Sequence, residues 1–276
     1  MTRHDHRQLT DALLPVVLAA GQLEMGYFNA GCAVETKADQ SPVTIADQQA
    51  EAMILKALAE IMPDQPIVAE EAFAAGQRWT VGETFLLVDA LDGTKQFVSG
   101  HREFTINIAI VSGGRPVYGL VYAPALGDLL VTDGTGVALR ATIEPGAPVT
   151  SLANADPTVV RVAPRYGAIV ALQSRSRNFD QSNVYLEDFP VAERRQLGSS
   201  YKFCLIAAGL ADIYPQLGDT REWDTAAGEA VLVAAGGHVV AADGTPIRYG
   251  KSAADYLNPK FIASSAPLAN LKTNAV

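Results

Sequence analysis

The chain has 276 residues, of which 49% are hydrophobic and 18% charged, and 21 Lys and Arg against 30 Asp and Glu give a net charge of −9. This composition excludes disordered, fibrous and coiled-coil proteins, and it argues against a nucleic-acid polymer as partner, because phosphate backbones are bound through an excess of cations. The two cysteines, Cys32 and Cys204, form no metal-binding spacing and indicate reduced thiols in a cytoplasmic protein.

The N-terminal part of the chain predicts two long helices. Apolar residues recur at helical spacing between Leu9 and Tyr27, and the apolar run there is too short to cross a membrane. A second helix is expected from Thr44 to Ile61, because Pro63 ends the periodic pattern. The sequence therefore predicts no transmembrane segment, and it leaves open both the oligomeric state and a peripheral association with the inner face of the membrane.

Short apolar segments then predict strands. Two of them, Pro66–Ala69 and Phe85–Val88, read as buried strands. A meander of antiparallel strands is expected after them, over Phe104–Val111, Val117–Tyr122 and Leu129–Val131.

The stretch Ala141–Pro157 has little periodicity and is the best linker candidate. We therefore expect an N-terminal lobe over residues 1–145 with most metal ligands, and a C-terminal lobe over residues 146–276 with Asp224 and the substrate contacts. The second lobe alternates strands and helices, which indicates an α/β protein. The expected elements are strands near Ile169–Leu172 and Ala211–Tyr214 and helices near Ser200–Leu210 and Asp224–Ala235.

Acidic residues gather at the ends of the predicted elements. Glu70 follows one buried strand, Asp89 and Asp92 follow the next, and Asp224 opens a helix. Each has an ordinary alternative role, because Asp often caps a helix and Glu after a strand is often solvated. Together with the Gly-Thr pair after Asp92, however, they form an oxygen-rich group beside backbone N–H groups that can hold a phosphate.

Four motifs, in this order along the chain, resemble the inositol monophosphatase superfamily. They are Lys37-Ala38-Asp39-Gln40-Ser41-Pro42-Val43-Thr44-Ile45-Ala46-Asp47, Ala69-Glu70-Glu71, Asp89-Ala90-Leu91-Asp92-Gly93-Thr94-Lys95-Gln96-Phe97 and Trp223-Asp224-Thr225-Ala226-Ala227-Gly228. Within the superfamily, two further segments resemble the CysQ-type 3'(2'),5'-bisphosphate nucleotidases. They are Gly198-Ser199-Ser200-Tyr201-Lys202-Phe203-Cys204 and Tyr256-Leu257-Asn258-Pro259. The resemblance implies a layered αβαβα sandwich of the inositol monophosphatase and fructose-1,6-bisphosphatase type.

The resemblance also implies a magnesium centre of two or three ions, with Mn²⁺ as a possible substitute and Li⁺ as an expected inhibitor. Carboxylate and carbonyl oxygens are the hard ligands that Mg²⁺ prefers. The implied ligands, with Asp89 shared between two ions, are Glu70, Asp89, the Leu91 carbonyl, Asp92 and Asp224.

For catalysis, the resemblance pairs Asp47 with Thr94 to orient and help deprotonate the attacking water, assisted by Glu70. Asp47 has an alternative role, because Thr44 and Asp47 also form a capping-box pattern, and one carboxylate could do both jobs. Thr94 could likewise be only a helix cap. The amides of Gly93 and Thr94 are implied to hold the transferred phosphate.

The expected substrate contacts are Arg175, Ser199, Ser200 and Lys202. Arg175 lies in the cluster Ser174-Arg175-Ser176-Arg177, for which a solvated surface is the alternative, and a surface charge is the alternative for Lys202. Arginine and lysine suit a second phosphate that is not cleaved.

The resemblance therefore implies Mg²⁺-dependent hydrolysis of the 3'-phosphate of 3'-phosphoadenosine 5'-phosphate, giving AMP and phosphate. An inositol-1-phosphate or sugar phosphatase with the same metal centre is the first alternative, because two positions depart from the expected pattern. Ala90 stands where the family usually has Pro, and Gln216 stands where nucleotidase relatives often carry Arg. A non-enzymatic protein that sequesters a nucleotide or metal is the second. The presence of Asp47, Glu70 and Thr94 speaks against this second alternative, because a binding protein needs no residues that activate water.

Overall fold

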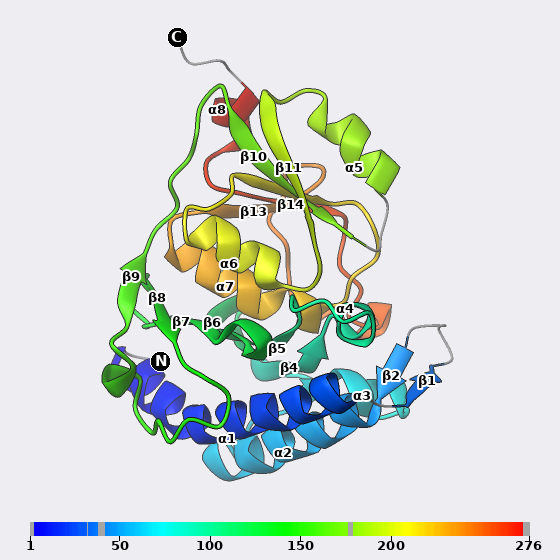
Figure 1. Ribbon diagram of the computed structural model, residues 1–276, viewed down its shortest axis with the longest axis vertical. Coiled ribbons are helices and arrows are strands. Elements are labelled where there is room, and N and C mark those ends of the chain that lie inside the picture. The colour runs from blue at the N-terminus through cyan, green and yellow to red at the C-terminus, as the bar shows by residue number, and fades with distance from the viewer. Residues whose placement is uncertain (1–2, 32, 38–41, 176–178, 273–276) are drawn as a thin grey trace.

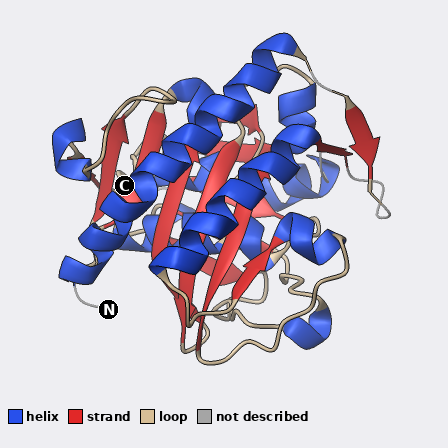
Figure 2. Cartoon of the chain, turned by 90° about the horizontal axis from the view of Figure 1, so that it is seen from below, coloured by secondary structure: helices blue, strands red, loops and turns tan. Residues whose placement is uncertain are grey.

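Two long helices, α1 (Arg3–Ala30) and α2 (Ile45–Ile61), form one outer layer of the molecule (Figure 1). The structure is a computed structural model that describes residues 3–31, 33–37, 42–175 and 179–272. The predicted apolar stripes are buried, with Leu13 and Ile54 at 0% exposure. Seen from below in Figure 2, both helices lie across the strands of a large sheet.

That sheet has seven strands in the order β3-β4-β5-β6-β7-β8-β9. All neighbours pair antiparallel except β3 and β4, which are parallel, so the predicted meander is confirmed. The strands are β3 (Ile67–Ala69), β4 (Thr84–Asp92), β5 (Thr105–Ser112), β6 (Arg115–Ala123), β7 (Asp128–Thr132), β8 (Ala138–Thr142) and β9 (Thr158–Val160).

The expected linker, Ala141–Pro157, overlaps the last two residues of β8, and the rest of it lies between β8 and β9 and contains one short 3-10 helix, η2 (Leu152–Ala155). Because β9 pairs with β8, the first sheet continues beyond this stretch. The division into lobes at residues 145 and 146 stays a prediction.

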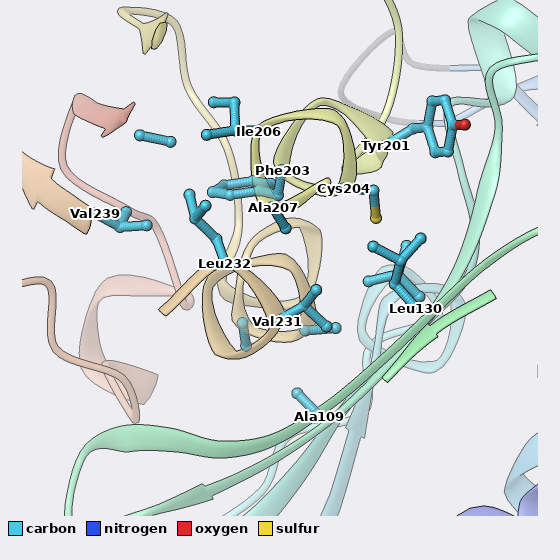
Figure 3. Close-up of a cluster of buried hydrophobic side chains, with 14 of the residues drawn as sticks. Ala109, Leu130, Tyr201, Phe203, Cys204, Ile206, Ala207, Val231, Leu232 and Val239 are labelled. Carbon is cyan, nitrogen blue, oxygen red and sulfur yellow. The ribbon is translucent and has the colours of Figure 1, made fainter. Parts of the chain in front are cut away.

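Helices α6 (Tyr201–Ala207) and α7 (Ala226–Ala234) form the middle layer. Side chains of these helices, including Phe203 and Leu232, pack between the two sheets in one apolar cluster (Figure 3). Helix α7 lies directly on β6, because a Cβ added at Gly119 would stand 2.3 Å from the Ala227 carbonyl oxygen. Only glycine allows this approach.

A second sheet has five strands in the order β11-β10-β12-β14-β13. Helices α5 (Phe179–Leu186) and α8 (Leu268–Lys272) lie outside it and complete the expected αβαβα sandwich (Figure 1). The strands are β10 (Ile169–Ser174), β11 (Val191–Leu197), β12 (Ile213–Gln216), β13 (His238–Ala241) and β14 (Phe261–Ser264).

Several very short elements connect the layers. They are β1 (Val34–Thr36), β2 (Pro42–Thr44), α3 (Glu70–Ala74), α4 (Thr94–Val98), η1 (Pro124–Leu126), η3 (Glu222–Asp224) and η4 (Ser252–Ala254). Cys204 is a buried free thiol, and Cys32 lies outside the described residues. Among the helices that the structure describes, none has the length and apolar character needed to cross a membrane.

Candidate active site

Carboxylates from three separate elements meet at one end of the seven-stranded sheet. Glu70 begins α3, Asp89 lies on β4, and Asp224 ends η3, and one oxygen of each lies within 4.8 Å of the others. The parallel register of β3 and β4 brings Ala69 opposite Val88. Glu70 follows Ala69 at the end of β3, and Asp89 follows Val88 within β4, so the two carboxylates lie at the same end of β3.

Asp89 is the most buried of the three, at 2% exposure. Its Oδ1 accepts the Leu91 N–H at 3.0 Å, whereas its Oδ2 is buried and has no hydrogen-bond partner among the described residues. Burial, together with the negative charges of Glu70, Asp92 and Asp224, raises the pKa of Asp89 well above its ordinary value. A buried, unpaired oxygen among like charges fits a site for a hard cation.

Asp92 stands outside this 4.8 Å group. A register shift separates it from Asp89 on β4, and its Oδ2 accepts the Ser200 N–H and lies 3.4 Å from Nδ2 of Asn107. Its charge still acts on Asp89. The Leu91 carbonyl oxygen lies 3.4 Å from the Thr94 hydroxyl.

Lys37 counters part of this negative charge, a role that the sequence analysis did not assign. Its Nζ lies 2.6 Å from Glu70 Oε1 and 2.6 Å from Glu71 Oε1. Burial lowers the pKa of Lys37, but the two carboxylates outweigh it and raise the pKa overall. The available signal was the position of Lys37 at the start of the first motif, whose residues 38–41 lie outside the described residues.

Asp47 uses both of its carboxylate oxygens. Oδ1 accepts the Thr94 hydroxyl at 2.8 Å, while Oδ2 accepts the Thr44 backbone N–H at 2.8 Å and the Thr44 hydroxyl at 2.6 Å. Asp47 therefore completes the capping box of α2 and also contacts Thr94. Burial raises the pKa of Asp47 although the hydrogen bonds from Thr44 and Thr94 lower it, and a raised pKa favours proton acceptance near neutral pH.

Gly93 forms the tight turn between β4 and α4. Its φ of 97° is in the left-handed region, and an added Cβ would lie 3.2 Å from both the Glu103 carbonyl oxygen and Cβ of Ser199. Glycine is needed here for its conformation and for space. The turn brings Gly93 against the segment that carries Ser199, Ser200 and Lys202.

Ser199 and Ser200 have different surroundings. The Ser200 hydroxyl is buried and bonds to Thr105 Oγ1 at 2.9 Å and Asn107 Oδ1 at 2.7 Å, which attaches the segment to β5. Ser199 adopts a φ of 52°, and its Oγ accepts the Tyr201 N–H at 3.2 Å.

Lys202 is 2% exposed, so the surface-charge alternative is wrong. Its Nζ donates to the Ser199 carbonyl oxygen at 2.6 Å and lies 3.4 Å from the Leu197 carbonyl oxygen. It also stands 4.8 Å from the centre of the Tyr214 ring. A positive charge is thus held directly behind the Ser199 turn.

Arg175 is exposed and bonds to Glu103 Oε1 at 2.7 Å and to the Gln196 carbonyl oxygen at 2.9 Å. It lines a pocket of about 360 Å³ together with Lys95 and His101. Ser176 and Arg177, from the same predicted cluster, lie outside the described residues.

Residues 5–275 match the inositol monophosphatase family. The chain belongs to this family. Among its relatives, the 3'(2'),5'-bisphosphate nucleotidase CysQ of Salmonella typhimurium is 39% identical over 228 residues, 82% of this chain and 86% of that protein. The CysQ of Buchnera aphidicola is 34% identical over 265 residues, 94% of each chain.

The crystal structure of CysQ from Bacteroides thetaiotaomicron, a bacterial member of the inositol monophosphatase family, resembles the fold with a TM-score of 0.77. Its sequence identity is 32%, and the match covers 95% of this chain and 98% of that one. The family resemblance and the layered fold expected from the sequence are confirmed.

Proposed function

We propose that this chain is a metal-dependent 3'(2'),5'-bisphosphate nucleotidase that hydrolyses the 3'-phosphate of 3'-phosphoadenosine 5'-phosphate to AMP and phosphate. The hydrogen bond of 2.8 Å between Thr94 and Asp47 is the observation that carries the reaction type. A protein that only sequesters a metal needs clustered carboxylates, but it does not need a hydrogen-bonded hydroxyl–carboxylate pair beside them. The CysQ relatives support the nucleotide substrate.

The residues present fit a magnesium centre. The unpaired Oδ2 of Asp89 and a donor set made only of oxygens match the preference of Mg²⁺, and Mn²⁺ accepts the same ligands. When bound, the ion polarises a phosphoryl oxygen and lowers the pKa of water. The residues that we expect to hold it are Glu70, Asp89, the Leu91 carbonyl, Asp92 and Asp224, and inhibition by Li⁺ stays an expectation.

The chain's own groups supply proton transfer and orientation. Because the Thr94 hydroxyl donates to Asp47, its oxygen is left with lone pairs that can accept a hydrogen bond from water. Asp47 can then receive the proton through Thr94, and the charge of Glu70 helps to raise the pKa of Asp47. The Gly93 and Thr94 amides stand at the start of α4, where backbone N–H groups can donate to a phosphate.

The second phosphate is assigned to the positive side of the site. Lys202 behind the Ser199 turn, with Arg175 on the rim, would hold the 5'-phosphate. Gln216 stands where nucleotidase relatives often carry Arg. Its Oε1 accepts a hydrogen bond from the Tyr214 hydroxyl at 2.8 Å. This departure is the observation that keeps an inositol or sugar phosphatase as the second candidate.

Phosphate release with Mg²⁺ from 3'-phosphoadenosine 5'-phosphate, inositol 1-phosphate and fructose 1,6-bisphosphate would test the proposal. We expect the highest kcat/KM for the bisphosphate nucleotide. A preference for inositol 1-phosphate would reject the substrate, and no release from any of the three would favour the binding protein. A cytoplasmic location stays a prediction, with the oligomeric state open.

A further inference from the structure

Helix α3, which begins with the metal-ligand candidate Glu70, lacks a cap of its own. Its N-cap residue, Ala69, has no side-chain oxygen, and the helix is only five residues long. The first N–H groups of a helix have no partner within it and must be satisfied from elsewhere. The start of α3 therefore depends on a group from another element.

Glu51 of α2 supplies that group. Its Oε2 accepts the Glu71 N–H at 2.7 Å, and its Oε1 accepts the Ala72 N–H at 2.8 Å. The side chain is 4% exposed, so water cannot readily replace these two bonds. A buried carboxylate that accepts two adjacent N–H groups fixes both the position and the direction of the first turn.

The same helix holds the water-activating pair. Asp47 and Glu51 are four residues apart on α2, so their side chains leave the same face one turn from each other. Asp47 contacts Thr94, and Glu51 holds the turn that begins with Glu70. One rigid helix thereby sets the distance between the group that activates water and a carboxylate of the metal site.

We propose that Glu51 is a positioning residue for Glu70: by accepting the N–H groups of Glu71 and Ala72, it aims the Glu70 carboxylate at Asp89 and Asp224. Glu51 lies outside the three-carboxylate group, and its two hydrogen bonds are to the N–H groups of α3. The inference rests on the metal site of the proposed function, but it requires neither a particular substrate nor the assignment of Lys202.

Isothermal titration of the metal-free protein with MgCl₂ tests this inference. Loss of a group that orients a metal ligand lowers metal affinity by about 10- to 100-fold, so Glu51→Ala should weaken Mg²⁺ binding by that factor. Glu51→Gln keeps one acceptor oxygen and should fall between Glu51→Ala and the parent protein. In turnover, both variants should need more Mg²⁺, while kcat at saturating Mg²⁺ should largely recover.

Asp11→Ala is the matched control. Asp11 of α1 accepts the Leu152 N–H at 2.7 Å and the Ser151 hydroxyl at 3.3 Å, so it also caps a short helix, η2, from another element. The control should lose stability without any change in Mg²⁺ affinity. If Glu51→Ala does not fold, the Mg²⁺ affinity of Glu51→Gln tests the inference instead.

Unchanged Mg²⁺ affinity in the Glu51 variants would overturn the inference and leave the proposed function intact. Equal losses of affinity in the Asp11 and Glu51 variants would also overturn it, because a general loss of stability would then explain both. No Mg²⁺ binding by the parent protein would instead remove the metal site itself, and the inference with it.

Discussion

Asp47 carries both of the roles that the sequence suggested for it, the helix cap and the contact with Thr94. A carboxylate has two oxygens, and here Oδ2 caps α2 while Oδ1 accepts the Thr94 hydroxyl. The motif Thr44-x-x-Asp47 is visible in the sequence, but the contact with Thr94 joins residues 47 positions apart. The family resemblance paired these two residues, and the structure adds the hydrogen bond between them.

These two roles can be separated by mutation. Thr94→Ala removes the hydroxyl but leaves the capping box, so turnover should fall by about 10²- to 10⁴-fold with little change in melting temperature. Asp47→Ala should lower turnover and also cost at most about 0.5 to 2 kcal/mol of stability, because the Asp47 half of the capping box is lost while Thr44 still caps α2. Initial rates and thermal unfolding measure the two effects. Parallel losses of activity and stability in Thr94→Ala would contradict this separation.

Lys202 offers a test of the second phosphate. A hydrogen bond to a charged group contributes about 1.5 to 3 kcal/mol, so Lys202→Met should lower kcat/KM for the bisphosphate by roughly 10- to 150-fold. Methionine fills most of the buried space, which limits the loss of packing. The control substrate is 3'-AMP, which lacks the 5'-phosphate and should lose little. Equal losses on both substrates would reject the assignment.

Glu24 of α1 is a buried acid. It is 0% exposed, and neither of its carboxylate oxygens has a hydrogen bond to a residue in the described part of the chain. Burial, and then the charge of Asp47, raises the pKa of Glu24 well above its ordinary value of 4.5. Between that ordinary value and the raised one, the folded chain holds a proton that the unfolded chain has lost, so stability falls as the pH rises.

Glu24→Leu should therefore stabilise the protein, and more at about pH 8 than at about pH 5. Removing an unsatisfied buried polar group should increase the stability by about 1 to 3 kcal/mol. Each kcal/mol should raise the melting temperature by about 2 to 4 °C. Glu24→Gln is the control, because it cannot ionise but stays polar; it should share only the pH-dependent part of the gain. An equal melting-temperature difference at both pH values would contradict the prediction.

At the scale of elements, length decides what the sequence can predict. The periodic pattern located α1 and α2, and apolar runs located β4 to β7, because many side chains in each element are buried. Helices α3 and α4 have five residues each, too few for a periodic signal, and β11 is mostly exposed at the sheet edge. Their structure depends on contacts from other elements, such as Glu51 on α3.

The turn at Gly93 positions part of the active site, so a change in this turn should affect metal binding and turnover. Gly93→Ala places a Cβ at 3.2 Å from Ser199 and the Glu103 carbonyl, in addition to the strain of a positive φ. We expect lower melting temperature, weaker Mg²⁺ binding and lower turnover. Gly100→Ala is the control, because its φ is 73° but an added Cβ meets nothing within 4 Å. It should cost about 1 kcal/mol of stability without affecting the site. Matching effects of the two substitutions would contradict the role of the Gly93 turn.

At the scale of the whole molecule, the site joins three layers. Asp47 comes from the outer helices, Asp89 from the first sheet, and Asp224 from the start of the middle helices. The family motifs predicted these residues as a set, but nothing in their spacing predicts that Glu70, Asp89 and Asp224 lie within 4.8 Å of each other. Their mutual repulsion must be overcome whenever the layers pack together.

Magnesium should therefore stabilise the entire fold. Binding to the folded state alone adds about 2.7 kcal/mol at 100 times the dissociation constant, which a thermal unfolding scan with and without a chelator would detect. Asp89→Asn removes the central charge, so it should raise the melting temperature of the metal-free protein and abolish both turnover and the shift with Mg²⁺.

A net charge of −9 requires one further control, because any salt screens repulsion over the surface. NaCl at the same ionic strength should reproduce only a small part of the Mg²⁺ shift, and Asp89→Asn should respond alike to both salts. If NaCl stabilised the parent protein as much as MgCl₂, general screening would explain the effect, and the three carboxylates would be no specific metal site. A specific site, by contrast, saturates with Mg²⁺ concentration, and the midpoint of that saturation should agree with the calorimetric affinity.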